Sequence, residues 1–280
     1  MANSKEETKI AKVDDSAMEL APTEINFESD SGYGMEEVDK DTLAIPFIFI
    51  LQATSPAVEK IDGAQSGMFM NSITEELFTE VEVIPCAFQR RYLRWEPRSK
   101  GGSFKGEYMP SDIETGRVEG CKEFDGRYYF DVPEGASLLD SAGKPLYDIA
   151  KDTRNHFVLF KSKDGSWGFA QISLSSTLVK KSKRWMSRIT GIEFTGKNGK
   201  KFNPASFANS YKLTRPATKE EKNGNAWWSI DINLFGPVTN NEVYAKAKAF
   251  HDQVASGTIK SVPMDDEAVS SSSNSDGESF

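Results

Sequence analysis

The sequence predicts a mainly β fold with a few helices, on three observations. Short runs of alternating, aromatic or β-branched residues recur through the middle of the chain, which is typical of strands. Asp164-Gly165 separates two such runs and is a strong hairpin signal, because this dipeptide supports the turn that antiparallel strands prefer. Two segments, residues 173–192 and 240–256, carry the apolar spacing of amphipathic helices.

Charge divides the chain into three parts. Residues 1–40 hold eleven acidic side chains against four lysines, and residues 263–280 hold five acids and no base. Polar, acidic segments with few large apolar residues cannot offset the entropy of ordering. We therefore expect a disordered acidic arm over residues 1–41, one folded domain over residues 42–260 and a disordered acidic tail over residues 261–280.

The strands are expected in the following order. Residues 43–53 form the first stretch that needs a core. Residues 80–88 begin with the period of two and continue into alternating basic and aromatic residues. Residues 99–123, rich in glycine, serine and charge, are expected to form a long loop. Further strands are expected over residues 127–132, 156–162, 166–173, 210–215 and 226–235.

Residues 173–192 are expected to form the central helix. Leu174, Leu178, Trp185 and Ile189 fall on one face, while lysine and arginine occupy most of the rest. Gly191 can end the helix. Trp185 is expected in the core because it lies on the apolar stripe.

Several strands with a hairpin, one helix, two further strands and a closing helix form the layout of an OB-fold. This fold is a five-stranded antiparallel Greek-key barrel with a helix inserted between the third and fourth strands. We expect one OB-fold-like domain with long loops and a C-terminal helix. OB-folds bind single strands and oligosaccharides on a strand face and on two of their loops.

Signals for catalysis and metal binding are weak. His156 and His251 belong to no motif with metal-ligand spacing, and Cys86 and Cys121 have no nearby partner. Glycine-rich phosphate loops are absent from the sequence. We expect a non-enzymatic protein without metal or cofactor. No apolar run approaches the length of a membrane span, and no signal peptide is evident.

Basic residues of the middle of the chain are interleaved with aromatic ones. Residues 151–219 hold fifteen Lys and Arg against three acids, a density typical of a surface for a polyanion. A solvated surface is the alternative for the charges and core packing for the rings. Single-stranded nucleic acid is held by cations that contact phosphates and by rings that stack on bases.

The residues predicted to bind nucleic acid combine these two types, and Tyr92 and Trp95 are the preferred candidates for stacking. The full set is Arg90, Arg91, Tyr92, Arg94, Trp95, Arg127, Tyr129, Lys161, Lys163, Trp167, Lys180, Lys181, Lys183, Arg184, Arg188, Lys212 and Arg215.

The acidic tail ends in a single aromatic residue, Phe280. A ring beside a free carboxylate can enter a small basic pocket on a partner. We therefore predict partner binding by Asp265, Asp266, Glu267 and Phe280, although serines divide the acids into two short groups.

An acidic tail ending in Phe behind a basic, aromatic and β-rich body resembles the single-stranded DNA-binding proteins of tailed bacteriophages and bacteria. Residues 84–92, 171–185 and 243–250 are similar to a family of phage proteins associated with that role, over about residues 42–257. The resemblance implies a protein that coats single-stranded DNA in replication or recombination, in the cytoplasm of an infected bacterial host. It also implies recruitment of phage or host replication proteins by the tail, and a possible homodimer.

Three alternatives stay open. The chain fits a structural or scaffold protein of the phage particle, in which basic residues contact packaged DNA or capsid components. It also fits a recombination protein that anneals strands, which would require stable rings or filaments on DNA. RNA is an alternative ligand to DNA.

Overall fold

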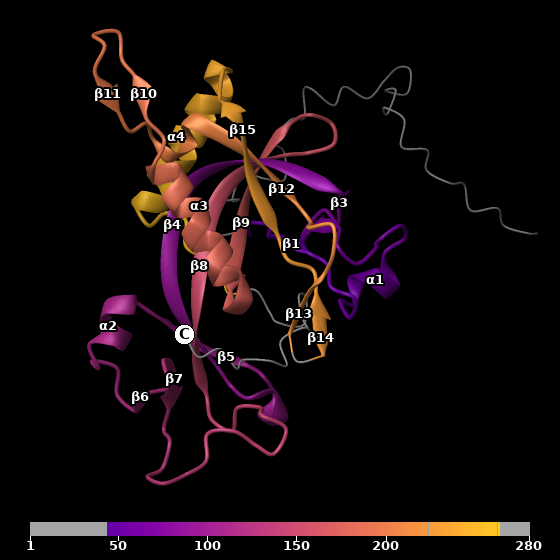
Figure 1. The fold of residues 1–280 in the computed structure, drawn as a ribbon, viewed down its shortest axis with the longest axis vertical. Helices are drawn as coiled ribbons and strands as arrows, with labels where there is room; N and C mark the ends of the chain where they lie inside the picture. The colour runs from indigo at the N-terminus through magenta and orange to yellow at the C-terminus, as the bar shows by residue number, and fades with distance from the viewer. Residues whose placement is uncertain (1–43, 223, 262, 264–280) are drawn as a thin grey trace, which may run out of the picture. The chain divides into compact units, whose positions relative to one another are not determined.

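The structure, a computed structural model, describes residues 44–222, 224–261 and 263 (Figure 1). Its main element is an eight-stranded antiparallel sheet. Five strands form the frame of this sheet: β4 (Glu80–Trp95), β8 (Ile149–Lys161), β9 (Trp167–Ser175), β12 (Asn209–Thr214) and β15 (Asp231–Pro237).

These five strands follow a Greek-key order. β4, β8 and β9 are neighbours in sequence order, and β12 returns to pair with the other edge of β4, with β15 beyond it. The helix α3 (Val179–Thr190) stands between the third and fourth of them along the chain. The mainly β class is confirmed, and the helix lies where the OB-fold layout expects it.

The sheet is larger than the expected five strands, because the connection between β4 and β8 adds three more. Residues 99–123, expected as a loop, contribute to this addition: β5 pairs with the end of β4, β7 pairs with β8, and β6 pairs with β7. The ends of the two long strands extend past their other partners and leave edges that this segment covers. The added elements are β5 (Phe104–Tyr108), α2 (Pro110–Glu114), β6 (Cys121–Phe124) and β7 (Arg127–Phe130).

One side of the barrel is open. Among the described residues no ladder joins β9 to β15, the third and fifth strands of the frame. The outer edge of β9 instead meets the segment before β1, where the N–H of Gln171 donates to the carbonyl of Pro46 at 2.8 Å. The OB-fold is itself a partly open barrel, so this opening is compatible with it.

The remaining strands form small sheets at the periphery. The expected strand over residues 226–235 is divided, because residues 228–230 interrupt it between β14 and β15. The peripheral elements are β1 (Ile48–Ile50), α1 (Ala57–Lys60), β2 (Phe69–Asn71), β3 (Leu77–Phe78), the hairpin of β10 (Phe194–Thr195) and β11 (Lys201–Phe202), and the hairpin of β13 (Glu220–Lys222) and β14 (Asn225–Trp227).

Two expected local structures are confirmed. Residues 163–165 join β8 to β9, and Asp164 Oδ1 accepts the N–H of Ser166 at 2.8 Å, which holds the turn. The closing helix α4 (Asn241–Ala255) begins at Asn240, whose Oδ1 accepts the N–H groups of Glu242 and Val243. No helix among the described residues is long and apolar enough to cross a membrane.

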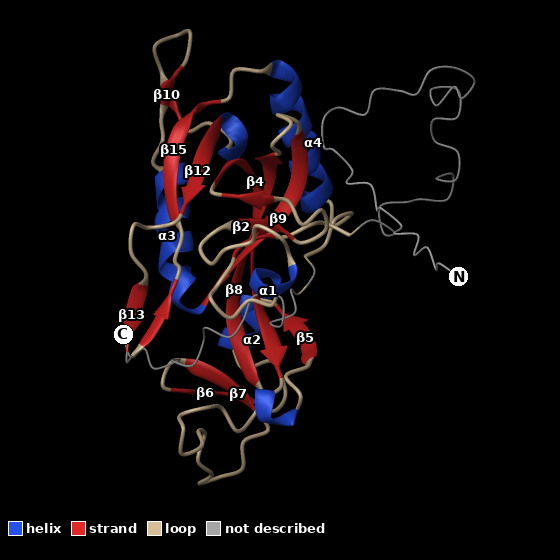
Figure 2. Ribbon diagram, turned by 90° about the vertical axis from the view of Figure 1, so that its right-hand side faces the viewer, coloured by secondary structure: helices blue, strands red, loops and turns tan. Residues whose placement is uncertain are grey.

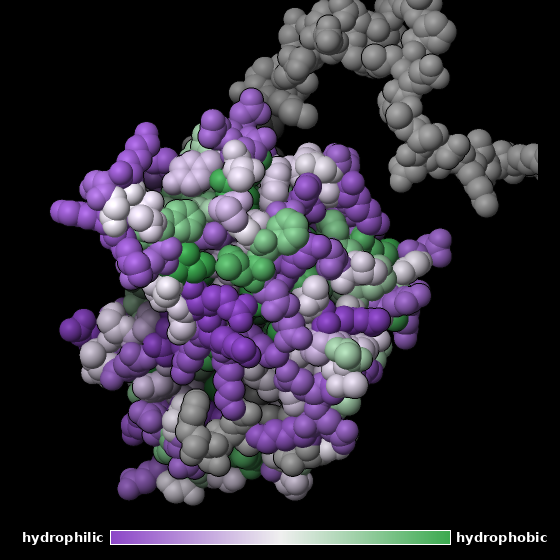
Figure 3. All heavy atoms as spheres, turned by 45° about the horizontal axis from the view of Figure 1, so that its top comes forward, coloured by the Kyte–Doolittle hydropathy of each residue, from purple (hydrophilic) through white to green (hydrophobic). Residues whose placement is uncertain are grey.

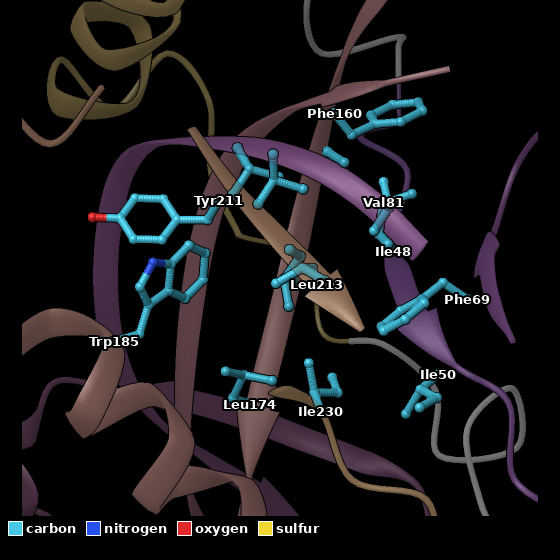
Figure 4. Close-up of a cluster of buried hydrophobic side chains, with 14 of the residues drawn as sticks. Ile48, Ile50, Phe69, Val81, Phe160, Leu174, Trp185, Tyr211, Leu213 and Ile230 are labelled. Carbon is cyan, nitrogen blue, oxygen red and sulfur yellow. The ribbon is translucent and has the colours of Figure 1, made fainter. Parts of the chain in front are cut away.

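The two faces of β8 build two cores, because successive side chains of a strand point to opposite faces. Val158 and Phe160 join a cluster closed by α3, while Phe157 and Leu159 join a cluster closed by α4. Figure 2 shows the two helices on opposite sides of these strands. Figure 4 shows the first core, where the buried Trp185 reaches from α3 to Tyr211, as expected of the apolar stripe.

A buried histidine lies beneath α3. The ring of His156 stacks on that of Trp185, with centroids 4.4 Å apart, and its Nε2 is 2.8 Å from Ser182 Oγ. Burial lowers the pKa of His156 to about 3, and the positive charge of Arg154 acts in the same direction. The imidazole is therefore neutral in the folded protein at neutral pH.

We predict that His156 makes the protein sensitive to acid. The unfolded chain binds a proton at this residue below its ordinary pKa of 6.5, whereas the folded chain does so only near 3. As the pH falls from 6.5 towards 3, this group therefore lowers the free energy of unfolding by about 1.4 kcal/mol per pH unit. Urea unfolding at pH 7 to 4 should give a flatter profile for His156→Gln than for the parent. Parallel profiles would contradict the assignment.

Candidate nucleic-acid interface

The three rings predicted near β4 and β7 are buried, which corrects the expectation that they stack on bases. Tyr92, Trp95 and Tyr129 are 6%, 6% and 2% exposed. The segment between β4 and β8 covers them: Tyr92 packs edge-on against Tyr128 at 5.3 Å, and Trp95 against Phe104 at 5.5 Å. These rings therefore stabilise the packing of the added strands, and of the three Tyr92 also lines the β4–β8 groove described below.

The three arginines of β4 are held in ion pairs. Arg91 pairs with Glu107 at 2.8 Å, and Arg94 pairs with Asp148 at 2.7 Å. Burial alone would lower the pKa of Arg94, but the bonded carboxylates raise it. Arg90 bonds Asp152 and also Glu114 at 2.8 Å. Arg91 and Arg94 thus bind the added segment to the sheet, and only Arg90 lines a cavity.

That cavity, the β4–β8 groove, has a volume of about 420 Å³ and is lined by β4, β7, β8 and the start of α3. Its size lies within the usual range of ligand pockets. Among the side chains that line it, Asp152 is the one carboxylate. The cations that line it are Arg90, Arg127, Lys151, Arg154 and Lys183. Three of these, Arg90, Arg127 and Lys183, belong to the predicted set.

One carboxylate serves two guanidinium groups in this groove. Asp152 accepts from Arg90 Nε at 3.0 Å and Nη2 at 3.1 Å, and from Arg154 Nη2 at 3.2 Å. Arg154 is 9% exposed, and its Nε has no acceptor among the described residues. A buried charge with incomplete pairing is costly.

The helix α3 extends the positive charge from the groove. Lys180, Lys183 and Arg184 are exposed, and Arg184 has no ion-pair partner in the described part of the chain. Lys181 pairs with Glu220 and Asp231, and Arg188 donates to the carbonyl of Ile232. On the face drawn in Figure 3, hydrophilic side chains form a band across the middle, beside a group of hydrophobic ones.

The remaining predicted cations line neither the groove nor any other cavity described for this chain. Lys161 lies 5.9 Å from the ring centroid of Trp167 and 3.7 Å from Glu82. Lys163 is exposed in the β8–β9 turn, and Lys212 pairs with Glu80 at 2.5 Å. The structure therefore does not bring these residues, or Trp167, together with the groove.

The sequence prediction missed Trp228. Its half-buried ring lies 4.8 Å from the guanidinium of Arg215 and 5.7 Å from the ammonium of Lys219. The side-chain amide of Gln52 holds the backbone of Trp228. Its Nε2 donates to the carbonyl of Trp228 at 2.9 Å, and its Oε1 accepts the backbone N–H of Trp228 at 2.8 Å. The pair Trp227-Trp228 was the available signal, but only the fold determines which ring is buried.

The groove also collects Tyr128, Lys151 and Arg154, which were not among the predicted residues. Their signal was the alternation of charge and rings in residues 127–154, spread over two strands. The predicted partner-binding residues Asp265, Asp266, Glu267 and Phe280 lie outside the described residues, as does the acidic arm. The domain boundaries remain predictions.

Groups suited to metal or thiol chemistry are scarce in the described part of the chain. No cluster of three or more His, Cys, Asp or Glu side chains there is arranged to hold a metal ion. Burial raises the pKa of the Cys86 thiol to about 12, so it stays protonated at neutral pH. The imidazole of His251 contacts the carbonyl of Cys86 at 2.9 Å.

One family model matches the chain. It is described as Pam3 phage gp34-like protein and covers residues 13–260. No curated protein and no solved structure matches the sequence. The matched range includes the whole sheet, both cores and the groove, together with part of the predicted arm, and it stops before Phe280.

We predict that Asp152 stabilises the fold through the groove arginines. Asp152→Asn removes the charge that two guanidinium groups share, so the free energy of unfolding should fall by about 1.5 to 3 kcal/mol. The control is Asp252→Asn, which breaks the exposed pair with Lys248 on α4 and should cost less than about 0.5 kcal/mol. Urea denaturation of the two variants measures the difference. Equal losses would mean that the groove arginines do not depend on this carboxylate.

Proposed function

The chain belongs to the Pam3 phage gp34-like protein family, and we propose that this phage protein binds single-stranded DNA without catalysing a reaction. In this proposal it coats and protects strands exposed during phage DNA replication or recombination, in the cytoplasm of the infected host. Phosphates are held by cations and bases stack on exposed rings. No cofactor is required.

The β4–β8 groove is the observation that supports this proposal most directly. It gathers five cations around one carboxylate, and the guanidinium of Arg154 is almost fully buried with an Nε that has no acceptor among the described residues. Sequence-independent binding of a strand rests on cations that replace condensed counterions on the phosphates. The half-buried ring of Tyr128 also lines the groove.

The topology gives further support. OB-folds bind strands across their second and third strands, between the loop joining strands one and two and the loop joining strands four and five. In this chain the first of those connections runs from β4 to β8 and contributes Arg127 and Tyr128 to the groove. The second, between β12 and β15, carries Trp228 with Arg215 and Lys219. Trp228 therefore replaces Tyr92 and Trp95 as the proposed stacking residue.

The partners remain part of the proposal. Single-stranded DNA is the proposed ligand, with RNA as the alternative, and the acidic tail is proposed to recruit phage or host replication proteins through Phe280. A homodimer is also proposed. These points rest on the sequence resemblance.

A structural or scaffold role in the phage particle is the second candidate, and β15 favours it. This strand is the edge of the sheet, and Leu234 and Phe235 on it are 47% and 57% exposed. An exposed edge strand with apolar side chains can pair with another subunit. A structural contact with DNA needs no base stacking, so selectivity for single strands separates the two functions.

We predict salt-sensitive binding that prefers single strands. Fluorescence anisotropy of a labelled oligonucleotide, beside a duplex of equal length, should show tighter binding of the single strand. The logarithm of the affinity should fall linearly with the logarithm of salt concentration, with a slope of about −0.7 per phosphate neutralised. A slope near zero, or no preference over duplex, would reject the proposal and favour the structural protein.

Arg127 provides the test within the groove, since it has no ion-pair partner in the described part of the chain. Arg127→Gln should weaken binding and reduce the magnitude of the salt slope by about 0.7. The matched control is Lys60→Gln on α1, an exposed cation that does not line the groove. The same change in both variants would mean that net charge, and not the groove, governs binding.

A further inference from the structure

A second, smaller cavity lies between α3 and β15. Its volume is about 60 Å³, and α3 contributes Lys181, Arg184, Trp185 and Arg188 to its wall, opposite Asp231 of β15. We propose that this cavity, the α3–β15 pocket, is an oxoanion site that takes one phosphate group.

The helical repeat separates this pocket from the β4–β8 groove. Positions 181, 184, 185 and 188 are three, four and seven residues apart and share one side of α3. Val179 and Lys183, which line the groove, fall on the opposite side of the helix. The two cavities therefore flank α3, and its outer surface between them carries Lys180, Lys183 and Arg184.

The wall of the pocket is rich in donors that the protein itself does not use. Arg188 donates through Nη1 to the carbonyl of Ile232, and its other N–H groups are not used by this bond. Arg184 has no acceptor in the part of the chain that the structure describes. Trp185 is 2% exposed, and its indole Nε1 likewise lacks an acceptor among the described residues. A buried N–H without an acceptor is destabilising, and the residue that carries it lines the pocket.

The acids near the pocket are engaged by one lysine. Lys181 Nζ lies 3.1 Å from Asp231 Oδ1 and 3.2 Å from Glu220 Oε1. These two acids thus pair with Lys181 and not with the guanidinium groups of Arg184 and Arg188. The fork geometry of a guanidinium suits phosphate oxygens.

Tyr211 lies beside Trp185, as Figure 4 shows, and its hydroxyl is a further buried polar atom without a partner in the described residues. Burial raises the pKa of Tyr211 to about 12, with the charge of Arg188 acting against this rise. The hydroxyl is therefore neutral at pH 7, and it adds no negative charge beneath the pocket.

The size of the pocket limits its ligand. Its volume of 60 Å³ is about that of two water molecules in the liquid, which suits a phosphate group and excludes a nucleobase. The same donors fit a free phosphate ion or a phosphate of a DNA strand. If the proposed function holds, a strand lying in the β4–β8 groove would cross the outer surface of α3 and place one phosphate in the pocket.

Inorganic phosphate tests the pocket directly. Thermal unfolding of the full chain should show a saturable rise in Tm, about 3 to 6 °C at ten times Kd, that sodium chloride of equal ionic strength does not reproduce. Arg184→Gln should lose this rise, measured from its own value without phosphate. Lys180→Gln removes the same charge from the same helix outside both cavities and should retain it. No saturable rise in the parent, or an undiminished rise in Arg184→Gln, would overturn the proposal.

Binding of single-stranded DNA then identifies the source of the phosphate. Arg184→Gln should reduce the magnitude of the salt slope by about 0.7, whereas Lys60→Gln should not. A phosphate effect with an unchanged slope supports the pocket for free phosphate and overturns the strand path. A phosphate effect without any DNA binding supports the pocket and rejects the proposed function. DNA binding without a phosphate effect rejects the pocket alone.

Discussion

The ladder between β4 and β8 is the contact on which the other parts of the molecule depend. It runs from Val83 opposite Phe160 to Trp95 opposite Ile149. At one end both faces are covered: Val158 and Phe160 of β8 pack in the core closed by α3, and Phe157 and Leu159 pack in the core closed by α4. At the other end the two strands extend past these helices. The segment between them folds back on that end and covers its edges, so a single long pair of strands supports both cores and the added strands.

The change from core to extension explains where the charge lies. From Phe157 to Phe160 of β8, where the two cores cover the ladder, the side chains are apolar on both faces. Beyond them, three arginines lie on β4 and one acid, Asp152, lies on β8, and acids of the added segment pair with Arg91 and Arg94. Arg90 and Arg154 must share Asp152. The groove is therefore positive because of how its acids are distributed, and the net charge of −8 for the whole chain does not describe it.

Local features of the fold could be predicted from the sequence because each depends on neighbouring residues. The turn at Asp164-Gly165, the apolar stripe of α3 and the cap and stripe of α4 are of this kind. The burial of Tyr92 and Trp95 could not be predicted, because alternating basic and aromatic residues occur both on solvated strands and on strands that other segments cover. Phe104, which packs on Trp95, comes from residues expected as a loop, and Asp152 and Asp148, which pair with Arg90 and Arg94, lie more than fifty positions along the chain. Which cations stay under-neutralised is thus a property of strand pairing.

One helix serves both the core and the charged surface, and Trp185 is where the two meet. Its ring stacks on His156 and closes the first core, while its N–H faces no acceptor in the described residues. A core built for stability alone would place an apolar ring there, because an unpaired buried donor costs free energy. Arg184 and Arg188 of α3 line the proposed α3–β15 pocket together with this residue. Any ligand that binds only the folded state stabilises that state by mass action. Anion binding at α3 would in this way be coupled to the stability of the core beneath it.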